Sequence, residues 1–308
     1  MPSIAVRVPI SLNRHFVTMT EVLARSLARN LQPGDWRLEL TVSRDTPHAL
    51  DSELLAWTAD FPVTVEWVDA ALFDRYSYIG TALQRHLRPT DMDLVAFMDA
   101  DTLVVGPLAE AVHTVLAIDG IGGRTAWDPP DVDLAALIAD VATAADLRRH
   151  VYAGYGVKFL TPEACPPYFN FGFVLASQAA VHRMSTGILL DAAAVFARAT
   201  SIFNAQISLC RNALRLGIPT AALHDKFNTG TSQKPLAMLD DSPEVRDRMV
   251  AIEESLADPR VLHYCPRQPT GFDKTRDMAS LEAAHRFAWG PEMQRGTLVL
   301  QRALRSLL

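Results

Sequence analysis

The stretch LVAFMDADTLVVGPL, from Leu94 to Leu108, decides the fold class. Its apolar run, Leu94 to Met98, is typical of a buried strand of a parallel sheet and stops at two aspartates, Asp99 and Asp101. Carboxylates two residues apart after such a strand can reach one point in space, and oxygen ligands suit Mg²⁺ or Mn²⁺, which complete their shells with water and phosphate oxygens. The plainer interpretation is that the triplet caps a turn, where aspartate is common.

The residues before this stretch alternate between strand and helix patterns. The expected strands are 4–8, 37–43 and 63–68, and the expected helices are 16–31, 52–59 and 76–86. Such alternation predicts an α/β protein with a mostly parallel sheet and helices on both faces. Ligands bind at the carboxyl ends of the strands in sheets of this kind, which is where Asp99 and Asp101 lie.

The second half of the chain has a looser pattern. Residues 120–167 are rich in glycine and proline, so we expect an insertion in which Trp127, Tyr152 and Tyr155 stack on a ligand or pack the loop. Further expected elements are a strand at 169–176, a helix at 195–216, a strand at 261–264 and C-terminal helices at 278–308. The predicted division is a catalytic domain, 1–275, and a C-terminal helical extension, 276–308.

Composition and charge limit the binding partners and the cellular location that we expect for this chain. With 308 residues, 49% apolar and 21% charged, the chain can bury one substantial core, and its net charge of -6 gives no overall attraction to nucleic acid. Three distant cysteines predict buried thiols in a reducing cytosol, and no window is apolar enough for a leader or a membrane span, so we expect a cytoplasmic protein. The amphipathic stretch 298–308 is expected to pack on its own domain, with a membrane surface or a second subunit, as in a homodimer, left open.

The same motif has an alternative interpretation as the active site of a hydrolase. Asp99-Ala100-Asp101-Thr102 is similar to the DxDx(T/V) string of haloacid dehalogenase-type phosphatases, in which Asp99 would be the nucleophile. In those enzymes the strand before the nucleophile is the first of the catalytic core, whereas nearly a hundred residues precede it here. They also need a later acidic pair after a strand, and Asp240-Asp241 follows a poor strand pattern. Position therefore argues against the phosphatase.

Four segments carry a family resemblance: VAFMDADTLVVGPL, YFNFGFVLAS, FNAQISLCRNAL and VLHYCPRQ. They occur in the order seen in retaining glycosyltransferases of the GT-A fold, and the chain resembles the family that includes glycogenin and bacterial lipopolysaccharide galactosyltransferases. The resemblance covers about residues 4–275. It implies a Rossmann-like GT-A sheet with a C-terminal helical tail. It also implies metal-dependent transfer of a sugar, with retention, from a nucleotide-sugar donor to an unidentified acceptor. UDP-sugar is the first choice of donor, and GDP-sugar is the alternative. The insertion at 120–167 would then be on the acceptor side, with its aromatic residues stacking on a sugar.

The resemblance also assigns the metal ligands. Asp99 and Asp101, with Ala100 between them, would bind Mn²⁺ (or Mg²⁺) and the donor ribose and diphosphate, and His263 would be a further ligand. A lone histidine after a strand is otherwise a satisfied core or surface residue.

Two other segments supply residues for the reacting sugar. Asn170 is expected to contact the donor sugar or the acceptor, Gly172 to let the backbone come close, and Gln206 to position and polarise. The alternative for Gly172 is a bulge in a buried strand. Ala205 stands where the family has aspartate, which puts the donor sugar in doubt and keeps open a catalytically silent nucleotide-sugar-binding protein.

The nucleotide contacts are assigned by the same resemblance. Pro9, Ile10 and Asn13, in the first strand-to-helix turn, are expected near the base, and Arg85 is expected either to face the diphosphate or to be a solvated helix residue. Two prolines, Pro266 and Pro269, replace the glycine and lysine of the family's His-x-x-Gly-x-x-Lys motif. The phosphate-binding cation is then expected to be Arg267 or Lys274.

Overall fold

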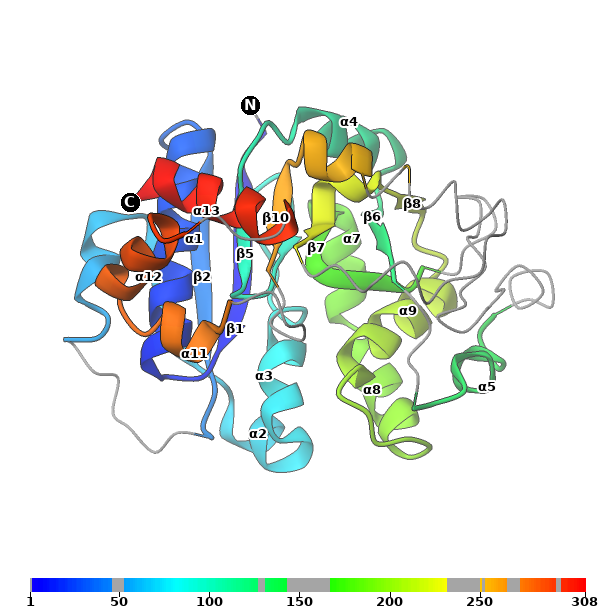
Figure 1. The fold of residues 1–308 in the computed structure, drawn as a ribbon. Helices are drawn as coiled ribbons and strands as arrows, with labels where there is room; N and C mark the ends of the chain where they lie inside the picture. Colours follow the sequence, from blue (N-terminus) through cyan, green and yellow to red (C-terminus); the bar gives the residue numbers. More distant parts are fainter. Residues whose placement is uncertain are drawn as a thin grey trace.

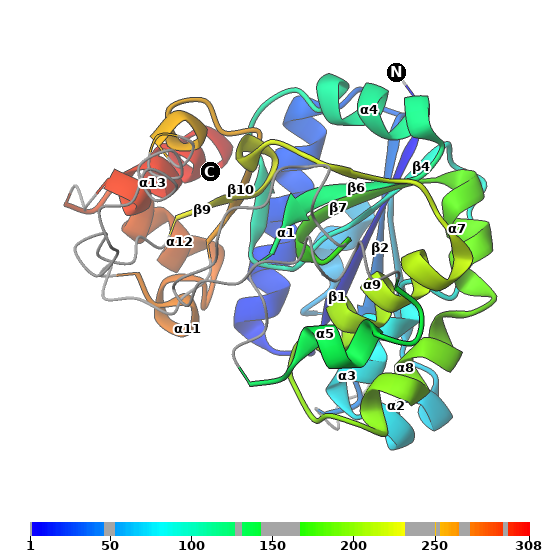
Figure 2. The same cartoon turned by 90° about the vertical axis from the view of Figure 1, so that its right-hand side faces the viewer.

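The computed structural model describes residues 2–45, 53–126, 131–142, 167–231, 250, 253–264, 272–291 and 295–308. They form a seven-stranded central sheet and a small three-stranded sheet (Figures 1 and 2). In spatial order the central strands are β3 (Val63–Trp67), β2 (Trp36–Val42), β1 (Ile4–Ile10), β4 (Leu94–Phe97), β7 (Phe169–Ser177), β6 (Ile121–Thr125) and β8 (Thr220–Ala222). The small sheet is ordered β5 (Thr102–Val104), β10 (Val261–His263) and β9 (Thr229–Gly230).

The central sheet is mostly parallel, as the sequence predicts. Strands β1 to β4 run parallel to one another, β7 is antiparallel to both β4 and β6, and β8 is parallel to β6. In β1, Val6 and Val8 pack into one hydrophobic cluster and Ala5 into the other. Burial on both faces explains why the inner strands are continuous apolar runs rather than alternating ones.

One face of the sheet is covered by α1 and α4, and the C-terminal helices pack against the outer side of α1 (Figure 2). These helices contribute Leu300 and Leu304, at most 1% exposed, to the same cluster as β1. The C-terminal helices therefore share a hydrophobic core with the first half of the chain. The helices are α1 (Arg14–Asn30), α4 (Ala109–Ile118), α11 (Lys274–Asp277), α12 (Leu281–Ala288) and α13 (Arg295–Leu307).

The opposite face is covered by helices of the middle of the chain (Figure 2). The described cysteine, Cys210 on α9, is buried there in one cluster with residues of α5, as expected. The helices are α2 (Ala70–Tyr76), α3 (Tyr78–Gln84), α5 (Leu134–Ile138), α7 (Gln178–Ser185), α8 (Ile188–Phe196) and α9 (Asn204–Leu216); two short 3₁₀ helices are η1 (Ala56–Asp60) and η3 (Asp225–Asn228).

Three predicted elements differ from the structure. The helix expected at 76–86 is present as the shorter α3, but an unpredicted helix, α2, precedes it, and Ser77, with a positive φ of 52°, separates the two. The helix expected at 195–216 is present only as α9 and the end of α8, with residues 197–203 outside both, and the helix expected at 52–59 is the short η1. Apolar spacing continues across these breaks, so periodicity alone does not reveal them.

The predicted insertion begins too early. Residues 121–125 form β6, which pairs with both β7 and β8 in the central sheet. A Cβ atom on Gly122 would lie 2.7 Å from Val115 Cγ2, and one on Gly123 would lie 2.8 Å from Phe169 Cγ. These glycines reflect close packing in a core strand rather than a loop.

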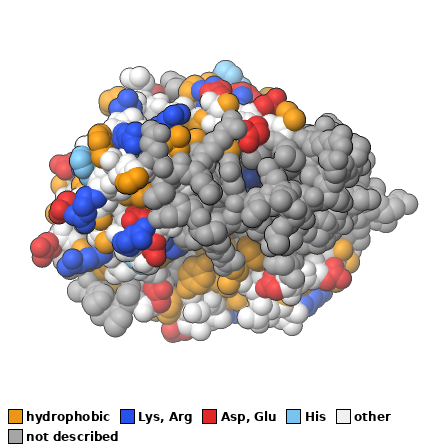
Figure 3. All heavy atoms as spheres, in the orientation of Figure 1, with side chains coloured by type: hydrophobic (Ala, Val, Ile, Leu, Met, Phe, Trp, Pro, Cys, Tyr) orange, Lys and Arg blue, Asp and Glu red, His pale blue; other side chains and the backbone are white. Residues whose placement is uncertain are grey.

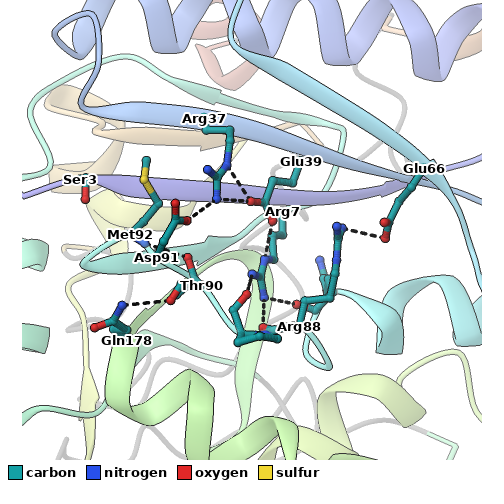
Figure 4. Close-up of polar contacts among 12 residues, drawn as sticks. Ser3, Arg7, Arg37, Glu39, Glu66, Arg88, Thr90, Asp91, Met92 and Gln178 are labelled. Atoms are coloured by element: carbon teal, nitrogen blue, oxygen red, sulfur yellow. Dashed lines mark hydrogen bonds and ion pairs between the residues drawn. The ribbon is translucent and has the colours of Figure 1, made fainter.

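A charged residue lies in the middle of this sheet. Arg7, on β1, is 1% exposed and donates from Nε to Glu39 Oε2 on β2 at 2.8 Å. Its terminal nitrogens donate to the main-chain carbonyls that follow α3, those of Arg85, Arg88 and Pro89 (Figure 4). A buried charge is tolerated only when it is paired and hydrogen-bonded, so this network fixes the turn after α3 to the sheet.

Replacing Arg7 by methionine is expected to lower the free energy of unfolding by about 3–5 kcal/mol, because Glu39 loses one of its two arginine partners, Arg37 being the other, and three carbonyls lose their donor. Urea unfolding followed by circular dichroism measures the change. Asp91→Asn, which removes an ion pair to Arg37 at an exposed carboxylate, is the control and should leave the midpoint nearly unchanged. Equal effects of the two variants would contradict the assigned role of Arg7.

The surface over the C-terminal helices alternates in charge (Figure 3). Arg276 pairs with Asp277 and Arg286 pairs with Glu282 on this face. Within the described parts of the chain, no helix is both long and apolar enough to span a bilayer.

Candidate metal centre

Asp99 and Asp101 lie where the chain leaves the central sheet and enters the small one. Strand β4 is fully buried and ends at Phe97, and β5 begins at Thr102. The hydroxyl of Thr102 donates to the carbonyl oxygen of Asp99 at 2.6 Å, which closes the turn. Both carboxylates are thus placed at the carboxyl end of a central strand, as the sequence predicts.

His263 reaches the aspartates through strand pairing. It is the last residue of β10, which runs antiparallel to β5 and places His263 opposite Thr102. The next residue, Tyr264, donates its main-chain N–H to the carbonyl of Asp101 at 2.9 Å. The register of the small sheet therefore brings together residues that are far apart in sequence.

The three side chains converge on one point. One carboxylate oxygen of each aspartate and one ring nitrogen of His263 lie within 4.8 Å of one another. His263 Nε2 is 3.3 Å from Asp101 Oδ1, and side-chain exposure is 35% for Asp99, 13% for Asp101 and 12% for His263. Two carboxylates and one imidazole form a donor set that fits Mn²⁺ or Mg²⁺, ions that complete their shells with water and phosphate oxygens.

The charges of the aspartates and of His263 shift each other's pKa values. Burial raises the pKa of Asp101, but the charge and hydrogen bond of His263 outweigh burial and hold that pKa below its ordinary value. Burial lowers the pKa of His263, but the charge of Asp101, its hydrogen bond and the charge of Asp99 outweigh burial and raise it. The two carboxylates therefore favour the protonated form of the imidazole.

We expect Mn²⁺ to bind more tightly as the pH rises from about 6 to about 8. The ligating imidazole must be neutral, and the raised pKa of His263 makes a proton compete with the ion, so affinity should grow by up to about tenfold per pH unit until His263 is deprotonated. Calorimetric titration at several pH values measures this. His263→Gln should bind weakly with little pH dependence, and a pH-independent wild type would contradict His263 as a ligand.

Arg85 lies behind Asp99. It is 1% exposed, and its Nη1 donates to the carbonyl of Met98 at 3.0 Å and to Asp99 Oδ1 at 3.4 Å. Its Cζ atom is 4.2 Å from the centre of the Phe171 ring. Arg85 thus orients a candidate ligand and is no solvated helix residue, while its contact with a diphosphate stays a prediction.

Asn170 and Gly172, both on β7, surround the other side of His263. Asn170 Oδ1 accepts from the Gly172 main-chain N–H at 3.0 Å and lies 3.1 Å from His263 Nδ1. A Cβ atom on Gly172 would lie 2.3 Å from His263 Nδ1 and 2.5 Å from Asn228 Oδ1. The imidazole therefore requires glycine at this position, and a close approach of the donor to it stays a prediction.

Asn228 was not expected at this site. It ends η3, is fully buried, and donates from Nδ2 to Asn170 Oδ1 at 2.9 Å. Its Oδ1 lies 3.2 Å from His263 Nδ1. The sequence around it, DKFNTG, contains no spacing or charge pattern that distinguishes it from an ordinary turn asparagine.

Gln206 lies in the first turn of α9 and is 8% exposed. Its Nε2 donates to the main-chain carbonyl of Phe169 at 3.2 Å, next to Asn170 along β7. Ala205, at the position where the resembled family has an aspartate, is buried in the core at 4% exposure. The structure places Gln206 beside the strand that carries Asn170, and its role toward a sugar stays a prediction.

The predicted base-binding residues end β1 and begin α1, next to the end of β4. Ile10 is buried at 3% exposure, and Pro9 and Asn13 are half-buried. Asn13 is the N-cap of α1 and accepts from the Phe16 N–H at 3.1 Å, which uses its side-chain oxygen. Ala100, between the two aspartates, is 3% exposed.

Two cations lie beside the cluster. The Lys274 ammonium is 5.4 Å from the centre of the Phe16 ring, and its charge helps lower the pKa of Asp101. Arg124, at the end of β6, acts on His263 and opposes the rise in its pKa. Lys274 was one of the two expected phosphate-binding cations, whereas Arg124 was not predicted.

Several predicted residues lie outside the described part of the chain. Arg267 is among them, with the two prolines that replace the family motif. The others are the aromatic residues expected at the acceptor side, Trp127, Tyr152 and Tyr155, and the pair Asp240-Asp241.

Solved structures share this architecture. A crystal structure of the galactosyltransferase LgtC in complex with donor and acceptor sugar analogues matches with a TM-score of 0.54 at 16% identity, covering 96% of this chain and 100% of that one. The apo structure of the bifunctional glycosyltransferase WbbM matches with a TM-score of 0.52 at 13% identity, and the match covers 98% of this chain and 52% of WbbM. Mouse xyloside xylosyltransferase 1 matches with a TM-score of 0.52 at 13% identity, and the match covers 87% of this chain and 99% of the mouse protein. No protein-family model and no curated protein matches the sequence. The chain therefore has the GT-A fold of these glycosyltransferases.

Proposed function

We propose that the protein is a divalent-metal-dependent glycosyltransferase that moves a sugar from a nucleoside-diphosphate sugar, with UDP-sugar as first choice, to an acceptor with retention of configuration. The observation that carries this proposal is the convergence of Asp99, Asp101 and His263 at the carboxyl end of β4 in a glycosyltransferase fold. A cytoplasmic location and a homodimer stay predictions from the sequence.

The bond from the anomeric carbon to the diphosphate breaks as the bond to the acceptor oxygen forms, and the acceptor proton passes to the leaving phosphate oxygen. A bound divalent ion would neutralise the charge that develops on that leaving group. Asp99 and Asp101 would hold the ion, Arg85 would keep Asp99 in place, and Lys274 would add positive charge toward the phosphates. Asn170 and Gln206 would position the reacting sugar, because an amide is a poor nucleophile.

Two other activities make different demands on these residues. A phosphatase would need Asp99 as a nucleophile after the first core strand, whereas Asp99 follows the fourth strand in chain order and faces a second carboxylate and an imidazole. A silent nucleotide-sugar-binding protein is consistent with the buried Ala205, where the family has an aspartate.

Donor hydrolysis separates the three functions. The full chain with Mn²⁺ is incubated with a panel of UDP- and GDP-sugars, and release of nucleoside diphosphate is measured with and without chelator. Slow, chelator-sensitive release from one donor supports the transferase. Phosphate release from a small phosphomonoester supports the phosphatase, and saturable nucleotide binding without turnover supports the silent binder; either result would contradict the proposal.

A further inference from the structure

The two ring nitrogens of His263 face different partners. Nε2 points to Asp101 Oδ1 at 3.3 Å, on the side of the candidate metal centre. Nδ1 points away from it, with Asn170 Oδ1 at 3.1 Å and Asn228 Oδ1 at 3.2 Å. The protonation of Nδ1 therefore depends on which atoms the two amide groups present.

Main-chain groups fix both amide orientations. The N–H of Gly172 can only donate, so the atom of Asn170 that it contacts at 3.0 Å must be the oxygen. The carbonyl of Asn170 can only accept, so the atom of Asn228 at 3.1 Å from it must be the nitrogen. Asn228 Oδ1 is then the atom left to face the imidazole.

Two oxygen acceptors therefore surround Nδ1, and this nitrogen must carry a hydrogen. A neutral imidazole with its hydrogen on Nδ1 has its lone pair on Nε2, which is the nitrogen beside Asp101 and Asp99. The other tautomer would place a lone pair against two oxygen atoms and a hydrogen toward the metal ion.

We infer that Asn228 is a positioning residue for the metal centre: with Asn170 it holds His263 in the tautomer whose Nε2 can bind a divalent ion. This inference rests on the proposed function. Asn228 is 0% exposed, and its hydrogen bonds join η3 to β7 and β10. Because a buried amide is costly unless satisfied, these contacts account for its presence.

The test compares two substitutions of similar size. Asn228→Leu removes the acceptor that faces Nδ1. Asn212→Leu is the matched control, because Asn212 is also 0% exposed but donates to Asp191 between α9 and α8. Binding of Mn²⁺ alone is measured by electron paramagnetic resonance titration, and the nitrogen modulation of the spin echo reports imidazole coordination.

We expect Asn228→Leu to weaken Mn²⁺ binding roughly 10- to 100-fold with loss of nitrogen modulation, and Asn212→Leu to bind within about threefold of wild type. Wild-type affinity and modulation in Asn228→Leu would overturn the inference and leave the proposed function standing. Equal weakening in Asn212→Leu would also overturn it, because general destabilisation would then be the cause. A wild type that binds no Mn²⁺ would overturn the metal centre and the proposed function together.

Discussion

Replacing Asp101 by alanine is expected to reduce sugar transfer by roughly a thousandfold or more while the protein stays folded. Its carboxylate is one of three candidate metal ligands and the one paired with His263 at 3.3 Å. Its structural contact is made by its main-chain carbonyl, which accepts from the Tyr264 N–H and survives the substitution. Turnover at saturating donor and Mn²⁺ measures the loss, and circular dichroism checks the fold.

Asp60→Ala is the control for this variant, because Asp60 is an exposed aspartate at the end of η1. It should keep wild-type turnover. Full activity in Asp101→Ala, or wild-type activity that survives excess chelator, would contradict a metal role for this carboxylate.

Replacing Gly172 by alanine is expected to lower Mn²⁺ affinity and turnover by about 100-fold. The added Cβ atom would lie 2.3 Å from His263 Nδ1 and 2.5 Å from Asn228 Oδ1, so the imidazole must leave its position. Overpacking should also lower the free energy of unfolding by about 1–3 kcal/mol. Metal titration, donor turnover and thermal unfolding measure the three effects separately.

Gly230→Ala provides the comparison, because Gly230 lies on β9 next to β10 and a Cβ there meets nothing within 4 Å. It is expected to keep wild-type metal affinity. Wild-type metal affinity and turnover in Gly172→Ala would mean that His263 can bind the ion from a displaced position. The close packing at Gly172 would then not be needed for metal binding.

The parts of the site that are local in sequence could be predicted from residue patterns. Asp99 and Asp101 are two residues apart and follow a buried strand, so one stretch contains the whole signal. His263 depended on the family resemblance, because its position is set by the pairing of β10 with β5. Asn228 was missed because its role exists only after three distant segments have packed together.

The fold shows the same division. Alternating strand and helix patterns predicted the parallel sheet, since each pattern is local. The glycines of β6 were misinterpreted because Gly122 and Gly123 are selected by contacts with Val115 and Phe169, which sequence alone does not reveal. The Arg7 network was likewise not anticipated, because its partners come from β2 and from the turn after α3.

A crystal of the full chain soaked with Mn²⁺ and UDP tests the central claim most directly. Anomalous scattering at the manganese edge should show an ion coordinated by Asp99, Asp101 and His263 Nε2, with the diphosphate completing its shell. Manganese bound elsewhere, or a diphosphate that binds without any ion at these three residues, would contradict the account.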